Sequence, residues 1–169
     1  MTARITGQEY LIWTGRLAGA NANLISPTFD PENTLKVKIR IAGYSAAATA
    51  RLQFNGDTGT TAYALSVGEN TSAVTTQVSG VAAGIQVATT NQVARALIVF
   101  EIGNISGDVH GVVWTGSTNS EAAATAPALV QGAGIWTTTA QITQITLNVG
   151  SGGGTMNAGT WMAIYGIAG

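Results

Sequence analysis

Apolar and polar residues alternate along most of the chain, and this two-residue period predicts β-strands. The clearest case is residues 35–41, LKVKIRI, where four apolar residues alternate with three cations. A strand built in this way buries one face and leaves the other in water. Residues 96–102, ALIVFEI, are apolar on both faces, which predicts a strand in the middle of a sheet. Seven further segments show strand patterns bounded by turn-forming residues: 10–17, 51–55, 62–67, 111–116, 135–139, 142–149 and 159–167.

Helical patterns are weak. Two alanine-rich stretches, Ser45 to Ala50 and Glu121 to Ala128, have helix propensity, but neither keeps an amphipathic period and Pro127 interrupts the second. We interpret both as loops or single turns. Strands at this spacing, with 22 glycines between and within them, favour an all-β fold over βαβ units. We predict a single-domain, jelly-roll-like antiparallel β-sandwich of about eight strands.

The first 33 residues differ in composition from the rest. One predicted strand is followed by GRLAGANANLISPTFDPEN (residues 15–33), which is rich in small residues and contains two prolines. This composition favours an extended arm or a long crossing loop. Two alternatives stay open: an arm that lies on a neighbouring subunit, or a loop that crosses the sandwich of its own chain. Residues 34–169 are predicted to form the sandwich, so we expect one compact domain overall.

Charged residues make up only 9% of the chain, against about 25% in an ordinary soluble domain. The polar positions hold mainly Thr, Ser, Asn, Gln and Gly, so the predicted surface is near neutral. Such a surface suits close contact with other subunits, and an ordinary monomer with a threonine-rich surface is the alternative. Six of the seven cations fall within residues 1–51, and the remainder of the chain is acidic. Regions of opposite charge are suited to meet across a subunit contact.

Several functional classes are disfavoured by what the chain lacks. It has no cysteine, which excludes disulfides and thiolate metal sites. The N-terminus does not look like a secretory signal, and no stretch approaches eighteen consecutive apolar residues. We therefore expect a soluble, unsecreted product without a membrane partner.

Candidate catalytic chemistry is sparse. The single histidine, His110, follows Ser106 and Asp108 at two-residue spacing. On a strand these three side chains would lie in a row on one face, which is not the bent chain of contacts that a catalytic triad needs. A turn followed by a strand is the simpler interpretation. We predict that the chain is not an enzyme and that it uses no cofactor.

An ion site has somewhat better support. Asn55 and Asp57 in FNGDTG, with Glu69 or Asn70 further on, supply oxygen ligands of the kind that Ca²⁺ accepts. The spacing lacks the EF-hand pattern, and Asn-Gly is a good turn sequence. We favour a structural turn and leave ion binding open. The glycine-rich run 150–154 has no following helix to hold a phosphate, and we predict a hairpin loop there.

The basic residues are the candidate contact residues. Alternation places Lys36, Lys38 and Arg40 on one strand face, where they could follow a phosphate backbone. No aromatic residues interleave with them and the chain is slightly acidic, so we expect no nucleic-acid partner. Protection of an exposed strand, or a protein contact, is the favoured interpretation. With Arg4 and Arg16 they form the predicted contact set for a larger particle or a neighbouring subunit.

The four tryptophans fall in four different predicted strands: Trp13, Trp114, Trp136 and Trp161. Anchoring of the core is the default interpretation of large aromatic residues in a sandwich. A sugar-binding surface and an oligomer contact are the alternatives.

Two stretches resemble phage virion proteins of the neck, tail and capsid-decoration type. The first is RLQFNGDTG (residues 51–59), followed by Tyr63. The second is ITQITL (residues 142–147), a glycine-rich loop, and AGT (158–160) leading into MAIYG (162–166). In such proteins the closing strand commonly ends in a similar apolar-Tyr-Gly tripeptide. The resemblance implies a jelly-roll-like sandwich, often trimeric, that cements a capsid surface or belongs to a fibre or adsorption apparatus. It brings no catalytic residue.

Two functional hypotheses follow. The first is a tailed-phage capsid decoration (cement) protein: a homotrimer that contacts the major capsid protein, is made in the host cytoplasm and lies on the capsid surface of the virion. Its contacts, modest singly, stabilise a shell by repetition. The second is a receptor- or glycan-binding module of a tail fibre or spike. The chain has no coiled-coil heptads or extended shaft, which favours the first hypothesis.

Overall fold

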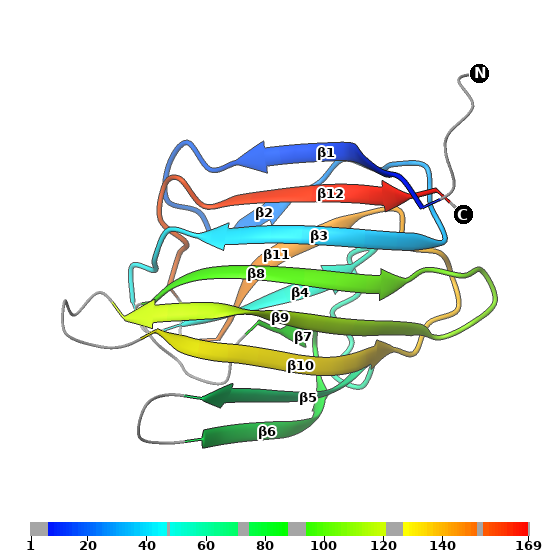
Figure 1. Cartoon of the computed structure of the whole chain (residues 1–169). Coiled ribbons are helices and arrows are strands. Elements are labelled where there is room, and N and C mark those ends of the chain that lie inside the picture. The colour runs from blue at the N-terminus through cyan, green and yellow to red at the C-terminus, as the bar shows by residue number, and fades with distance from the viewer. Residues whose placement is uncertain are drawn as a thin grey trace.

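In the computed structural model the chain folds into two antiparallel β-sheets that pack face to face (Figure 1). The structure describes residues 7–46, 48–70, 75–87, 94–120, 127–151 and 154–168, and these residues form twelve strands and no helix. The predicted all-β sandwich is therefore confirmed.

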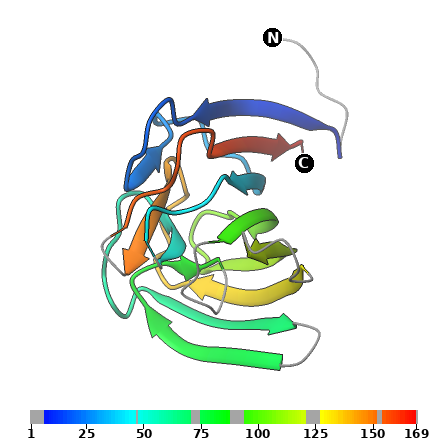
Figure 2. The same ribbon diagram turned by 90° about the vertical axis from the view of Figure 1, so that its left-hand side faces the viewer.

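One sheet is twice as wide as the other. The wide sheet has the strand order β1 (Glu9–Arg16), β12 (Trp161–Ile167), β3 (Thr34–Ile41), β8 (Ala94–Gly103), β9 (His110–Ser120), β10 (Ala128–Trp136), β5 (Tyr63–Asn70) and β6 (Thr75–Ala82). The narrow sheet has the order β2 (Asn23–Ile25), β11 (Ile145–Ser151), β4 (Thr49–Phe54) and β7 (Ile85–Gln86). Figure 2 shows the wide sheet as a long stack of strands with β5 and β6 at one end.

Eight of the strands pair in a nested order. The first strand pairs with the last, β2 with β11, β3 with β8, and β4 with β7. Two further hairpins, β5–β6 and β9–β10, lengthen the wide sheet beyond β8. About eight strands were predicted and twelve are described, because β2, β6 and β7 have no counterpart among the predicted segments.

The core lies between the inner faces of the two sheets. The alternation in residues 35–41 is confirmed, because every apolar residue of that segment is buried and the cations point the other way. Trp114 and Trp136 are also buried, as expected of core anchors, whereas Trp13 is only partly covered. The largest fully buried side chains come from both sheets: Trp136, Tyr63, Phe54, Phe100, Leu35, Ile39, Ile41, Leu52, Ile85, Ile98, Ile102 and Ile142.

Residues 17–33 run across the sandwich of their own chain. The Leu17 amide donates to the Thr160 carbonyl at 2.8 Å, and the Phe29 amide donates to the Thr143 carbonyl at 2.8 Å. Between these two points β2 pairs with β11 in the narrow sheet. The segment therefore leaves the wide sheet at the end of β1 and returns to it at β3.

Two sequence predictions need correction. The predicted strand 135–139 overlaps β10 only at residues 135 and 136, because β10 runs from Ala128 to Trp136. Its inner face includes Gly132, which interrupts the apolar pattern but is required there because the Trp114 ring occupies the space of a β-carbon. The predicted hairpin at residues 150–154 is wrong, because β11 and β12 belong to different sheets and their connection crosses between them.

Candidate functional site

The single histidine belongs to the core. His110 is completely buried, its ring stacks on Trp136 at 5.2 Å between centroids, and its two nitrogens lie against backbone carbonyls. Nδ1 lies 3.2 Å from the Gly103 oxygen and Nε2 lies 2.8 Å from the Ala140 oxygen. Ser106 and Asp108 are exposed. The structure therefore does not bring these three side chains together as a catalytic group.

The Asn55 and Asp57 turn is held by its own side chains. Asp57 accepts hydrogen bonds from the Trp136 indole at 2.8 Å and from the Gly59 amide at 2.9 Å. Asn55 has a positive φ of 51°, and its side-chain oxygen accepts from the amide of Thr143 at 2.8 Å. These bonds tie the end of β4 to β10 and to the segment before β11.

No group of three or more metal-ligating side chains occurs among the residues that the structure describes. The Asn55 and Asp57 oxygens already serve as acceptors within the turn, which fits the structural interpretation of FNGDTG. The side chains of Glu69 and Asn70, the other proposed ligands, lie outside the described part of the chain.

The predicted contact residues fall on different parts of the wide sheet. Arg4 lies outside the described residues, and Arg16 is exposed at the end of β1. Lys36, Lys38 and Arg40 share the outer face of β3, pointing away from the narrow sheet.

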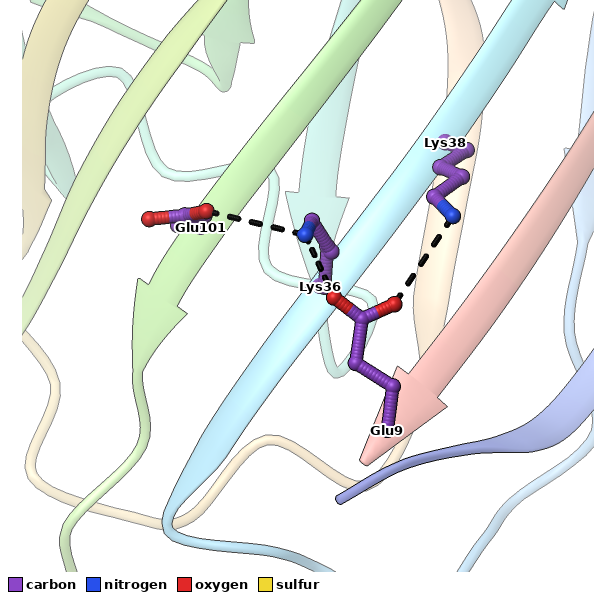
Figure 3. A network of polar contacts seen from close by, with 4 residues as sticks. All are labelled: Glu9, Lys36, Lys38 and Glu101. Carbon is purple, nitrogen blue, oxygen red and sulfur yellow. Dashed lines mark hydrogen bonds and ion pairs between the residues drawn. The ribbon is translucent and has the colours of Figure 1, made fainter. Parts of the chain in front are cut away.

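Figure 3 shows that Lys36 and Lys38 are not free cations. Glu9 of β1 reaches across β12 and places one carboxylate oxygen 2.5 Å from Lys36 Nζ and the other 3.8 Å from Lys38 Nζ. Glu101 of β8 lies 3.8 Å from Lys36 on the other side. The hydrogen bond from Lys36 lowers the pKa of Glu9, and the same bond raises the pKa of Lys36. The Lys38 ammonium also lies 4.4 Å from the centre of the Tyr165 ring.

The outer face of the wide sheet is thus divided into two halves. The half made of β1, β12, β3 and β8 carries the ion pairs. The strands β9 and β10 contain no Asp, Glu, Lys or Arg at all. On their outer side Val113, Leu129 and Ile135 are 52%, 50% and 39% exposed, and Leu97 of β8 borders them at 53%. We call this surface, made of Leu97, Val113, Leu129 and Ile135, the neutral face.

The apolar side chains of the neutral face stand among polar ones. Ser117 lies between Leu97 and Leu129, the pair Thr115 and Gln131 separates Leu129 from Val113, and Glu101 of β8 lies opposite Val113. Half-exposed apolar residues are common on soluble proteins, and a surface of neutral polar groups that carries several of them is suited to a protein contact. Sequence patterning located part of this surface, because residues 96–102 are apolar on both sides and predict a central strand. β8 is indeed the fourth of eight strands. What the pattern did not reveal is that its second apolar side remains uncovered.

A small groove lies beside the neutral face. It has a volume of about 180 Å³ and is bordered by Arg40, Arg95, Leu97, Ser117 and Asn119. Its two guanidinium groups come from neighbouring strands, β3 and β8. Guanidinium groups pair well with carboxylates, so the groove is suited to an acidic group.

Comparisons with known proteins do not assign this chain to a group. No family model, no curated protein and no solved structure matches it. Within the described ranges no helix has the length and apolarity to cross a membrane.

Glu9→Gln is expected to remove an acid-sensitive part of the stability. Because the folded pKa of Glu9 lies below its ordinary value of 4.5, the ion pairs favour folding fully above that value and are lost as the pH falls through the folded pKa. Urea midpoints of the two proteins should therefore differ near pH 6 and converge as the pH falls below 4.5 and through the folded pKa. The difference should stay below about 1 kcal/mol because the pairs are exposed to solvent. Asp108→Asn, an exposed loop carboxylate, is the control, and a pH-independent difference for Glu9→Gln would contradict this account.

Asp57→Ala should destabilise the fold by about 2 to 3 kcal/mol, because it leaves the buried Trp136 indole without an acceptor. Asp57→Asn retains an acceptor oxygen and should cost less. Chemical denaturation followed by tryptophan fluorescence measures both variants. Equal midpoints for Asp57→Ala and the unmodified chain would show that the turn does not depend on this carboxylate.

Proposed function

We propose that this chain is a non-enzymatic structural protein of a tailed-phage particle, a capsid decoration (cement) protein that assembles with itself and binds the major capsid protein. The observation that carries the proposal is the neutral face. A β-sheet surface without charge and with several half-exposed apolar side chains is suited to be covered by another protein.

The fold is compatible with this role. A jelly roll is a double sheet of eight strands. We assign this architecture to the eight strands that pair in nested order: β1 with β12, β2 with β11, β3 with β8 and β4 with β7. The sequence resemblance to phage virion proteins implies the same architecture and a homotrimer.

The energies involved fit a protein that acts in many copies. Completing the burial of a half-exposed Val or Leu contributes roughly 1 kcal/mol. A surface with a few such residues gives a weak contact in an isolated pair. Repeated over a shell, the same contact becomes strong, because each bound copy raises the effective concentration of the next. The ion pairs of Lys36 and Lys38 with Glu9 and Glu101 lower the positive charge that a nucleic-acid partner would need.

A receptor- or glycan-binding module of a tail fibre or spike is the second candidate. The observation that favours it is the groove beside Arg40 and Arg95. Its volume is well below the roughly 300 Å³ of a pocket for a drug-sized ligand, so it would hold a single acidic group. Binding of acidic but not neutral glycans on an array, lost in Arg40→Gln, would favour this second function.

Val113→Glu tests the association surface. A buried charge opposes the contact. Because Glu101 of β8 lies opposite Val113, the new carboxylate also lowers the stability of the single chain by like-charge repulsion, and a thermal melt checks that the variant is folded. Sedimentation should show a lower mass than for the unmodified chain. Val109→Glu, at a loop residue of similar exposure, is the matched control. An unchanged mass for Val113→Glu would contradict association through the neutral face.

The capsid role needs its own measurement. Capsids prepared without this chain should lose integrity at a lower temperature, and adding the purified protein back should restore their resistance. Val109→Glu should restore it and Val113→Glu should not. Equal heat resistance with and without the chain would overturn the cement function.

A further inference from the structure

The edges of the two sheets are protected to different degrees. A free strand edge exposes unpaired N–H and C=O groups that can pair with another chain, and soluble proteins usually block it. The narrow sheet ends in β2 and β7, which have only three and two residues. Such short strands offer few hydrogen bonds to a partner.

The wide sheet begins at β1, which is guarded in several ways. Its pairing with β12 shifts register between Leu11 and Trp13. The Trp13 ring folds along its own strand over Gly15, where it occupies the space of a β-carbon. Charged residues stand at both ends, Glu9 and Arg16. Irregular pairing and charges are the usual devices that prevent a second strand from docking.

The other end of the wide sheet, β6, has none of these devices. Its eight residues, TTQVSGVA, include no charge and no proline. Its pairing with β5 is continuous, from Tyr63 opposite Ala82 to Asn70 opposite Thr75. Among the described strands β6 pairs with β5 alone, and it forms the rim of the sheet in Figures 1 and 2.

We infer that β6 pairs with β6 of a second copy, antiparallel and about a two-fold axis, so that the two wide sheets become one continuous sheet. The inference deepens the proposed function, on which it rests, by naming a second copy as the partner at this edge. A strand without charges pairs with itself without repulsion, and two-fold contacts are the commonest in homo-oligomers.

The register of such a pair is restricted. Side chains alternate between the two faces of a sheet, and residues directly opposite each other in an antiparallel pair point to the same face. In a self-pairing strand the axis must therefore pass through a residue pair and not between residues. The pairs that keep most of the strand in contact have Val78 opposite Val78 or Ser79 opposite Ser79.

The β6 edge and the neutral face are separate surfaces. One copy can therefore use both, and the resulting assembly has more copies than either contact gives alone. If the neutral face makes the proposed trimer, an added two-fold contact gives a closed assembly of six copies or an open net over a shell. In solution we expect the closed assembly of six copies.

The masses of four proteins in solution distinguish the contact at the β6 edge from the contact at the neutral face. The unmodified chain is expected to sediment as six copies, Ser79→Lys as three, Val113→Glu as two, and the double variant as one. Lysine on an edge strand blocks pairing while leaving the chain folded, which a thermal melt checks. A fall in mass for Val113→Glu but not for Ser79→Lys would overturn the edge contact and keep the proposed association. The reverse pattern would keep the edge contact alone, and a monomeric unmodified chain would overturn both.

Cross-linking gives an independent test, because the chain contains no cysteine. Opposite residues in an antiparallel pair have Cα atoms about 4.5 to 5.5 Å apart, within the range that a disulfide spans. Under mild oxidation, Val78→Cys or Ser79→Cys should form a reducible dimer. Thr14→Cys, on the guarded edge β1, is the matched control. If neither variant cross-links faster than Thr14→Cys, the edge contact is overturned.

Discussion

A β-sheet has two faces, and in a two-layer sandwich only one of them can be buried inside the molecule. The arrangement of this protein depends on that constraint, because its wide sheet has eight strands whose outer face must be either hydrated or covered. The usual solution is to alternate apolar residues inside with charged residues outside. β3 follows it strictly, with its cations outside and its apolar residues in the core. β9 and β10 do not, since their outer positions hold only neutral residues.

The two halves of the outer face therefore have different physical roles. In the charged half, Glu9 holds Lys36 and Lys38 together across β12, and these ion pairs keep the surface polar and hydrated. On β9 and β10 the groups that water can hydrate are uncharged hydroxyls and amides, such as those of Thr115 and Gln131. A low overall charge of 9% is thus not spread evenly over the molecule. Seven of the fifteen charged residues stand on β1, β3 and β8, and β9 and β10 have none.

Local patterning predicted the strands that obey the two-residue period. It failed where contacts between strands require a residue that breaks this period. β3 and β8 were located closely because their inner positions are uniformly apolar. Most of β10 was missed because Gly132 stands at an inner position to make room for the Trp114 ring, a requirement visible only once β9 and β10 are paired. The basic residues were found, but their partner Glu9 is 27 residues from Lys36, so their neutralisation depends on strand order. Strand order also decides which edges are free, and no local pattern carries that information.

The uncovered face lies on the central strands β8, β9 and β10, and the open edge β6 lies beyond β5 in the same sheet. Both features favour assembly over solitary function. A monomer would need to hydrate an uncharged apolar surface and to protect an unguarded eight-residue edge, and each would favour aggregation. The same chain guards its other long edge, β1, with a register shift, a folded tryptophan and two charges. The fold can therefore carry edge protection, and of the two edges of the wide sheet β1 has these devices and β6 does not. This contrast is the reason for the proposal that other copies cover the outer face of β9 and β10 and the edge of β6.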